Sequence, residues 1–274
     1  MIDETRTNTN VPVVSVVIPT YNQADYLREA IDSVLQQSFN DYEIIIVNNF
    51  STDHTQDIVE SFNDPRITFV NLKNNGIIAA SRNKGIELSK GKYVAFLDSD
   101  DYWYPGKLKI CMDAFQLDYD VVCHAELWIK NKKPYKEVVY GPEKRAHYDS
   151  LLFEGNCVST SATIVRKDLL MQTGGFAEDA KLVTVEDYDL WLRLSKMGSR
   201  FKFISHILGI YRLHDSNASA VVSRHLQSSF AVLEKHFSNI ENKNTRLLLG
   251  YYKRKIKLLL GAFYRYVSSS FKHE

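Results

Sequence analysis

The sequence has few cysteines, little net charge and no long apolar run. Its three cysteines, Cys111, Cys123 and Cys157, are widely spaced, which argues against a disulfide framework or a zinc site and favours a reducing compartment. The formal net charge is +1, so overall charge predicts no nucleic-acid partner. No run approaches the ~18 apolar residues that span a bilayer, and residues 1–12 lack the apolar core of a secretion signal. We expect a cytoplasmic protein; its oligomeric state is not predicted.

A glycine-rich phosphate loop is also missing. The first strand-like run ends in Pro19-Thr20-Tyr21-Asn22, which matches neither GxGxxG nor GxxxxGK[ST]. This absence argues against a dehydrogenase or an ATPase. Any phosphate bound at this position must be neutralised by other groups.

The first part of the chain alternates between two kinds of pattern. Short, nearly unbroken apolar runs are typical of strands covered on both faces, and apolar residues three or four apart are typical of helices. Alternation of the two predicts an α/β fold with a parallel, doubly wound sheet. The predicted strands are 13–19, 43–47, 67–72 and 93–97, and the predicted helices are 25–37, 53–62 and 77–89.

The second part is less regular. Residues 131–148 are polar, with two prolines and a glycine, and predict a long loop. We expect a strand at 162–166, a helix at 186–197 that ends before Gly198, and extended chain at 201–213. From residue 226 onward the pattern is helical and increasingly basic.

An acidic cluster, Asp98-Ser99-Asp100-Asp101, directly follows the fourth predicted strand. Three crowded carboxylates repel one another unless a cation gathers them, and Mg²⁺ or Mn²⁺ prefers one or two carboxylates together with phosphate oxygens. The alternative is a solvated turn that precedes a helix. Ligands bind beyond the carboxyl ends of strands in such sheets, so this position favours a metal site.

Two further clusters carry charge. Glu186-Asp187-Tyr188-Asp189 opens a helix, where the dipole favours acids; Asp189 is expected to pair with Arg193, and Leu190, Trp191 and Leu194 to lie in the core. Glu186 and Asp187 precede or begin the first turn and can project into a cleft. Tyr211-Arg212-Leu213-His214 ends a late strand and offers a basic pair for a diphosphate or a metal. Arg82 is another cation of the first half, with solvent exposure as the alternative.

Seven segments together closely resemble the family 2 glycosyltransferases of bacterial surface-polysaccharide synthesis, which are inverting enzymes with the GT-A fold. The resemblance implies a Rossmann-like, mostly parallel sheet flanked by helices. It divides the chain into a polar tail (1–12), a nucleotide-sugar-binding half (13–117), an acceptor-binding and catalytic half of the same domain (118–220) and a basic helical extension (221–274). The segments are VSVVIPTYNQADYLREAIDSVLQQSF, EIIIVNNFSTD, SRNKGI, GKYVAFLDSDDYW, TGGF, VEDYDLWLRLSKMG and YRLHDSNAS.

The resemblance also implies roles for single residues. Asp187 would be the catalytic base, and Asp100, with His214, would hold Mn²⁺ or Mg²⁺. Glu186 would bind the acceptor, and we expect Trp128 to face the acceptor cleft. The nucleotide contacts would come from Pro19, Tyr21, Asn49, Arg82, Asp98, Ser99 and Arg212.

The implied reaction moves a sugar from a nucleotide diphosphate to a hydroxyl of a saccharide or lipid-linked acceptor. One position departs from the family: the usual Asp-Asp after the second strand is Asn48-Asn49 here. An Asp there can accept the imide N–H of uracil, and an Asn amide can both donate and accept. A uridine donor is therefore the first choice, with cytidine and guanosine donors open. The alternatives in function are a nucleotidyltransferase that makes nucleotide sugars and a degenerate sugar-nucleotide-binding module.

The C-terminal segment is basic and amphipathic. From Arg246 onward it holds seven Lys or Arg and one acid. Such a helix either lies on a membrane surface through residues 246–267, at the inner face of the cytoplasmic membrane, or packs on the catalytic domain with its basic face in water. The sequence leaves both interpretations open.

Overall fold

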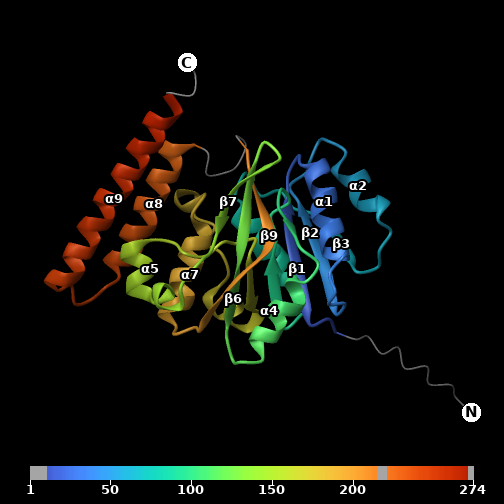
Figure 1. Ribbon diagram of the computed structural model, residues 1–274, viewed down its shortest axis with the longest axis horizontal. Helices are drawn as coiled ribbons and strands as arrows, with labels where there is room; N and C mark the ends of the chain where they lie inside the picture. The colour runs from blue at the N-terminus through green and yellow to red at the C-terminus, as the bar shows by residue number, and fades with distance from the viewer. Residues whose placement is uncertain (1–10, 215–220, 271–274) are drawn as a thin grey trace, which may run out of the picture.

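The computed structural model describes residues 11–214 and 221–270, which form one sheet with helices on both faces and a helical pair at one end (Figure 1). Most of the predicted polar tail, residues 1–10, lies outside this part, as do residues 215–220 and 271–274. Within the described residues the strand order is β3-β2-β1-β4-β8-β6-β9-β5, and β7 pairs with β6. The strands are β1 Val14–Thr20, β2 Tyr42–Asn48, β3 Ile67–Asn71, β4 Tyr93–Phe96, β5 Tyr102–Trp103, β6 Val121–Lys130, β7 Lys133–Val138, β8 Thr163–Arg166 and β9 Phe201–Leu213.

The first four strands are parallel and confirm the predicted α/β alternation. Every residue of β1 and β2 is buried, because helices cover both faces of this part of the sheet. One core lies between the sheet and α1 and α4, and a second lies on the opposite face with α3, α5, α6 and α7. The helices are α1 Ala24–Leu35, α2 Thr55–Ser61, α3 Ile78–Leu88, α4 Lys107–Phe115, α5 Tyr148–Glu154, α6 Lys167–Thr173, α7 Glu186–Lys196, α8 Val222–Ser238 and α9 Thr245–Ser270, with short 3₁₀ turns η1 Glu143–Ala146 and η2 Ala180–Leu182.

The second half adds both parallel and antiparallel strands to the same sheet. β8 runs antiparallel to β4, β6 antiparallel to β8, and β9 parallel to β6. The long loop predicted for residues 131–148 is wrong, because 133–138 form β7, which pairs with β6 in a hairpin. All but the last residue of β7 are exposed. The strand is therefore held by backbone pairing, and its sequence carries no apolar periodicity that would reveal it.

Asp189 ties α7 to the helical extension. Its fully buried carboxylate accepts from Arg193 at 2.8 Å, as predicted, and also from Lys235 at 2.7 Å and His236 at 3.0 Å on α8. Burial alone would raise the pKa of Asp189, but these three partners hold it below its usual value. The predicted core residues of α7, Leu190, Trp191 and Leu194, are fully buried.

The long helix α9 lies along the outer side of α8, at the opposite end of the molecule from β2 and β3 (Figure 1). It packs on α8 and α5, and the Tyr251 ring stacks on Phe237 with centroids 4.2 Å apart. A second side of the helix carries apolar residues that remain exposed: Leu248, Leu249, Tyr252, Ile256, Leu259, Leu260, Phe263, Tyr264 and Tyr266. Among the described residues, the helices are too short or too polar to cross a bilayer.

Candidate active site

A cavity of about 750 Å³ opens at the carboxyl ends of the parallel strands. The parallel register places β2 and β4 on either side of β1, so the residues that follow these three strands meet at one edge. Asp100 and Asp187, which lie far apart in the sequence, line this one cavity. So do eight other residues predicted for the site: Pro19, Tyr21, Asn49, Arg82, Asp98, Ser99, Trp128 and Glu186.

The carboxylates of the acidic cluster after β4 have different partners. Asp98 pairs with Arg82 at 2.7 Å. Asp101 is buried and accepts from the Ser161 hydroxyl at 2.6 Å and the Arg212 backbone at 2.9 Å. Burial raises the pKa of Asp101 well above its usual value. Arg82 and Ser161 therefore bind the carboxylates of Asp98 and Asp101, and the carboxylate of Asp100 lies beside His214.

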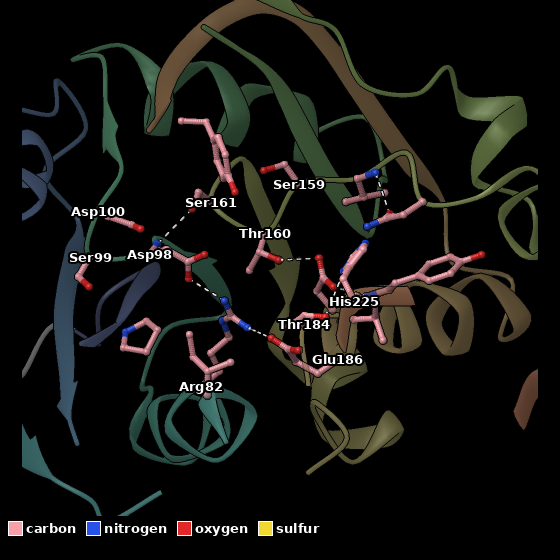
Figure 2. Close-up of a pocket in the computed structure, with 18 of the residues that line it drawn as sticks. Arg82, Asp98, Ser99, Asp100, Ser159, Thr160, Ser161, Thr184, Glu186 and His225 are labelled. Carbon is pink, nitrogen blue, oxygen red and sulfur yellow. Dashed lines mark hydrogen bonds and ion pairs between the residues drawn. The ribbon is translucent and has the colours of Figure 1, made fainter. Parts of the chain in front are cut away.

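Arg82 bridges the two halves of the site. Its guanidinium is 4% exposed and lies between Asp98 and Glu186, at 2.7 and 2.6 Å (Figure 2). The alternative of a solvent-exposed Arg82 is excluded. Glu186, predicted to bind the acceptor, uses one oxygen on Arg82. Its other oxygen, Oε2, is buried and makes no hydrogen bond to the described residues.

Asp187 begins α7 with its carboxylate turned toward the cavity. Oδ2 accepts from the Thr160 hydroxyl at 3.1 Å, and Oδ1 accepts from the Tyr188 backbone at 2.7 Å. Burial, followed by the nearby charge of Glu186, raises the pKa of Asp187 to about 7. A base with a pKa near the working pH is more effective than the ordinary aspartate of pKa ~4 expected from sequence.

Arg212 and His214 lie beside Asp100 and are not among the described residues that line the cavity. The guanidinium of Arg212 donates to the Asp100 carbonyl at 2.8 Å and also contacts Glu29 of α1. The ring of His214 stacks on Tyr26, and its Nε2 is 2.8 Å from the Asp100 carboxylate. The last residues of the motif, 215–219, lie outside the described part of the chain.

The donor atoms around Asp100 fit a divalent metal that a diphosphate completes. A carboxylate oxygen and an imidazole nitrogen, each mostly buried, meet at 2.8 Å. Among residues 11–214 and 221–270, three or more metal-ligating side chains do not gather at one point. Mg²⁺ and Mn²⁺ sites commonly use one or two carboxylates plus substrate phosphates, so Asp100 and His214 would supply the protein's share.

The region after β1 and β2 also lines the cavity. Asn49 lines the cavity, and its Oδ1 accepts from the Asn74 backbone at 2.9 Å. Asn48 is instead buried and bonds to Asn71 and Ser51. The hydroxyl of Ser99 donates to Gln23 at 2.5 Å. Of the Asn48-Asn49 pair, Asn49 is therefore the residue that lines the cavity.

Sequence reasoning missed a polar chain on β6. Glu126 is 1% exposed, and its carboxylate accepts from Tyr140, whose hydroxyl in turn accepts from the Trp128 indole at 3.2 Å. Burial raises the pKa of Glu126 to about 7. The available signal was an acidic residue, Glu126, in the middle of a mostly apolar strand. Trp128, predicted to face the acceptor, is fixed by these hydrogen bonds and by Tyr211, whose ring lies 5.0 Å away.

Comparison with known proteins agrees with this architecture. The profile described as glycosyl transferase family 2 matches residues 15–174. The putative teichuronic acid biosynthesis glycosyltransferase TuaG of Bacillus subtilis is 33% identical over 214 residues, 76% of this chain and 82% of TuaG.

Two solved structures share the fold. S. aureus TarS 1-349 in complex with UDP-GlcNAc superposes with a TM-score of 0.70 at 21% identity, over 89% of this chain and 72% of that one. The mannosyltransferase PcManGT of Pyrobaculum calidifontis, in complex with GDP-Man and Mn²⁺, gives 0.65 at 17% identity, over 94% and 75%. The predicted GT-A fold is confirmed, and the chain belongs to glycosyl transferase family 2.

Proposed function

We propose that this chain is an inverting, metal-dependent glycosyltransferase that moves a sugar from a UDP-sugar to a hydroxyl acceptor in surface-polysaccharide synthesis. The observation that carries the proposal is that Asp100 and Asp187 line one cavity. The UDP-GlcNAc in the TarS structure and the teichuronic acid pathway in the name of TuaG support the donor and the process.

In this proposal the two ends of the cavity have different roles in the reaction. Asp100 and His214 would hold a divalent metal, which neutralises charge on the departing diphosphate. Asp187 takes the proton of the attacking hydroxyl. Asp98 is fixed by Arg82 at 2.7 Å and contacts the ribose. A single displacement from the face opposite the diphosphate inverts the anomeric carbon.

The proposal is tested by a panel of nucleotide sugars without added acceptor. We expect UDP-sugars to raise the melting temperature and to be hydrolysed slowly with release of UDP. A nucleotidyltransferase would instead leave the UDP-sugar intact until pyrophosphate is added, and would then form UTP and the sugar 1-phosphate; a binding module would be stabilised without hydrolysis. If no nucleotide sugar stabilises the chain, the proposed donor site is wrong.

The metal role predicts that Asp100→Ala weakens donor binding only when Mn²⁺ or Mg²⁺ is present. Removal of the carboxylate leaves His214 alone in the protein's share of ligands, so the metal-dependent increase in affinity should disappear. Calorimetric titration of UDP with and without the metal measures this difference. Asp113→Asn, at an exposed ion pair on α4, is the control. Full activity in excess chelator would contradict the prediction.

The donor base is tested at Asn49. We expect Asn49→Asp to keep or tighten UDP binding, because the aspartate preserves the bond to the Asn74 backbone and offers its second oxygen to the uracil imide. Hydrogen bonds to charged groups contribute about 1.5–3 kcal/mol, so the gain can reach roughly ten- to a hundredfold. Competition between UDP, CDP and GDP measures it. Tighter binding of CDP than of UDP by the wild-type chain would refute the uridine assignment.

Helix α9 supports a peripheral contact with the inner face of the membrane. Its exposed apolar side is bordered by Arg246, Lys253 and Lys257, and its residues 245–270 contain no acid. Apolar burial and attraction to anionic lipid both favour such a helix at a membrane surface. We expect flotation with vesicles that contain phosphatidylglycerol, and loss of flotation for Ile256→Glu with Phe263→Glu. Equal flotation of this variant and the wild type would remove the membrane contact.

A further inference from the structure

The end of the cavity away from Asp100 is lined by basic residues that the proposed reaction does not use. Arg145 of η1, His225 of α8 and Arg254 of α9 all line it. Figure 2 shows His225 and Thr184 on the opposite side of the cavity from Asp98, Ser99 and Asp100. The acidic, metal-binding end and this basic end therefore face different parts of the bound substrates.

Arg254 reaches the cavity across Gly155. A Cβ at Gly155 would lie 2.6 Å from both terminal nitrogens of the guanidinium, and the backbone φ of +105° also requires glycine. One of these nitrogens donates to the Glu154 carbonyl at 3.2 Å. Burial, and then the nearby charge of Arg145, lowers the pKa of Arg254. Burial of this cation costs free energy. None of the described carboxylates pairs with Arg254 to offset that cost.

Arg145 approaches the same point from the other side. It donates to the Gly155 carbonyl at 3.1 Å. Its Nε forms an ion pair with the half-exposed carboxylate of Glu154 at 3.1 Å, although this N–H makes no hydrogen bond. The two carbonyls at the end of α5 and this one carboxylate accept only some of the donors of two guanidiniums, because each guanidinium has five N–H donors. The surplus donors and positive charge fit an anion.

His225 completes the basic end. Its Nδ1 is 3.0 Å from the Thr184 hydroxyl. Burial, and then the charges of Arg265 and Arg254, lowers its pKa. The nearby carboxylate of Glu186 raises the pKa of His225, but Glu186 is already paired with Arg82. Because the lowered pKa favours the uncharged ring, the positive charge at this end comes from Arg145 and Arg254.

We propose that Arg145 and Arg254 bind a phosphate group of the acceptor while the acceptor's hydroxyl faces Asp187. The inference rests on the proposed function and names the chemical class of its second substrate. The geometry allows one molecule to make both contacts, because Asp187, Arg145 and Arg254 all line the same cavity. Such a phosphate belongs either to a lipid-linked saccharide or to a soluble sugar phosphate.

The test is calorimetric titration of the full chain saturated with UDP and Mn²⁺, which occupies the donor end. The probes are glucose 1-phosphate and octyl phosphate, with methyl glucoside and octyl glucoside as their uncharged controls. We expect the phosphates to bind and the controls to bind at least tenfold more weakly. Octyl phosphate binding alone indicates a lipid-linked acceptor, and binding of glucose 1-phosphate to the same extent indicates a soluble one.

Three variants separate a specific site from general charge. Arg254→Gln and Arg145→Gln should each weaken the phosphate probes on the order of tenfold and leave the titration with UDP unchanged. Lys253→Gln makes the same change of charge at an exposed neighbour on α9 and should have no effect. Absence of phosphate binding, or equal losses in Lys253→Gln and Arg254→Gln, would overturn the acceptor site. Failure of UDP to bind the wild-type chain would instead refute the proposed donor site.

Discussion

Asp187→Asn is expected to bind UDP and its sugars as the wild type does and to lose most turnover. Asparagine keeps the shape of the side chain and can still accept from the Thr160 hydroxyl, which lies 3.1 Å from Oδ2, but it cannot take a proton. General-base assistance contributes roughly 10²–10⁴-fold to such reactions. The expected loss in kcat is of that size, with little change in the dissociation constant for UDP.

The measurement compares transfer rates with UDP titrations for wild type, Asp187→Asn and the surface control Asp113→Asn. A rate near that of the wild type in Asp187→Asn would show that another group is the base. Glu186 is the next carboxylate to test, because it lines the same cavity and its Oε2 makes no hydrogen bond to the described residues.

The pH profile gives an independent reading of the same residue. The pKa of Asp187 is raised to about 7 by burial and then by Glu186, and only the ionised form can act as a base. The transfer rate should therefore fall as the pH decreases through about 7, roughly tenfold per unit below it. The residual activity of Asp187→Asn should lack this limb. A wild-type rate that stays constant down to pH 5 would contradict the raised pKa.

The parallel half of the fold was predictable from sequence because burial leaves a direct mark there. Strands covered on both faces must be apolar throughout, and β1 and β2 are; their predicted ends differ from the observed ones by one residue. The strand β7 could not be predicted in the same way. Its side chains face solvent, so the property that makes it a strand, its pairing with β6, leaves no trace in its composition.

The site was predictable where chemistry follows directly after a strand or opens a helix. Asp100 and Asp187 meet that condition and line one cavity. The partners of Arg82 and Arg254 did not follow from local patterns, because each lies on a distant element. Arg82 bonds to Glu186 across 104 positions, and Arg254 reaches Glu154 across 100. Sequence spacing cannot show that Arg82 neutralises Asp98 or that Arg254 enters the cavity.

Arg82→Leu is expected to produce the largest loss of stability among the site variants. Leucine fills much of the volume of Arg82, but it leaves the carboxylates of Asp98 and Glu186 without the cation between them, and Glu186 is 8% exposed. Removing one partner of a buried pair costs about 3–5 kcal/mol. Thermal unfolding should shift downward by roughly 6–20 °C.

The control is the triple variant in which Asp98→Asn and Glu186→Gln accompany Arg82→Leu. Replacing a whole buried ionic group with uncharged residues is often nearly neutral, so this variant should recover most of the lost stability. A melting temperature equal to that of Arg82→Leu alone would show that packing, and not charge, accounts for the loss.

The loss of stability in Arg82→Leu should also depend on pH, and its sign is set by the carboxyl group of Asp98. Burial already raises the pKa of Asp98 beside Arg82, and the loss of Arg82 raises it further in the folded state only. A folded carboxyl with a raised pKa binds protons that the unfolded chain releases, so folding is favoured at low pH and loses stability as the pH rises. The stability of Arg82→Leu should therefore be closer to that of the wild type at pH 5 than at pH 8. An equal deficit at both values would mean that Asp98 and Glu186 find other cations when Arg82 is absent.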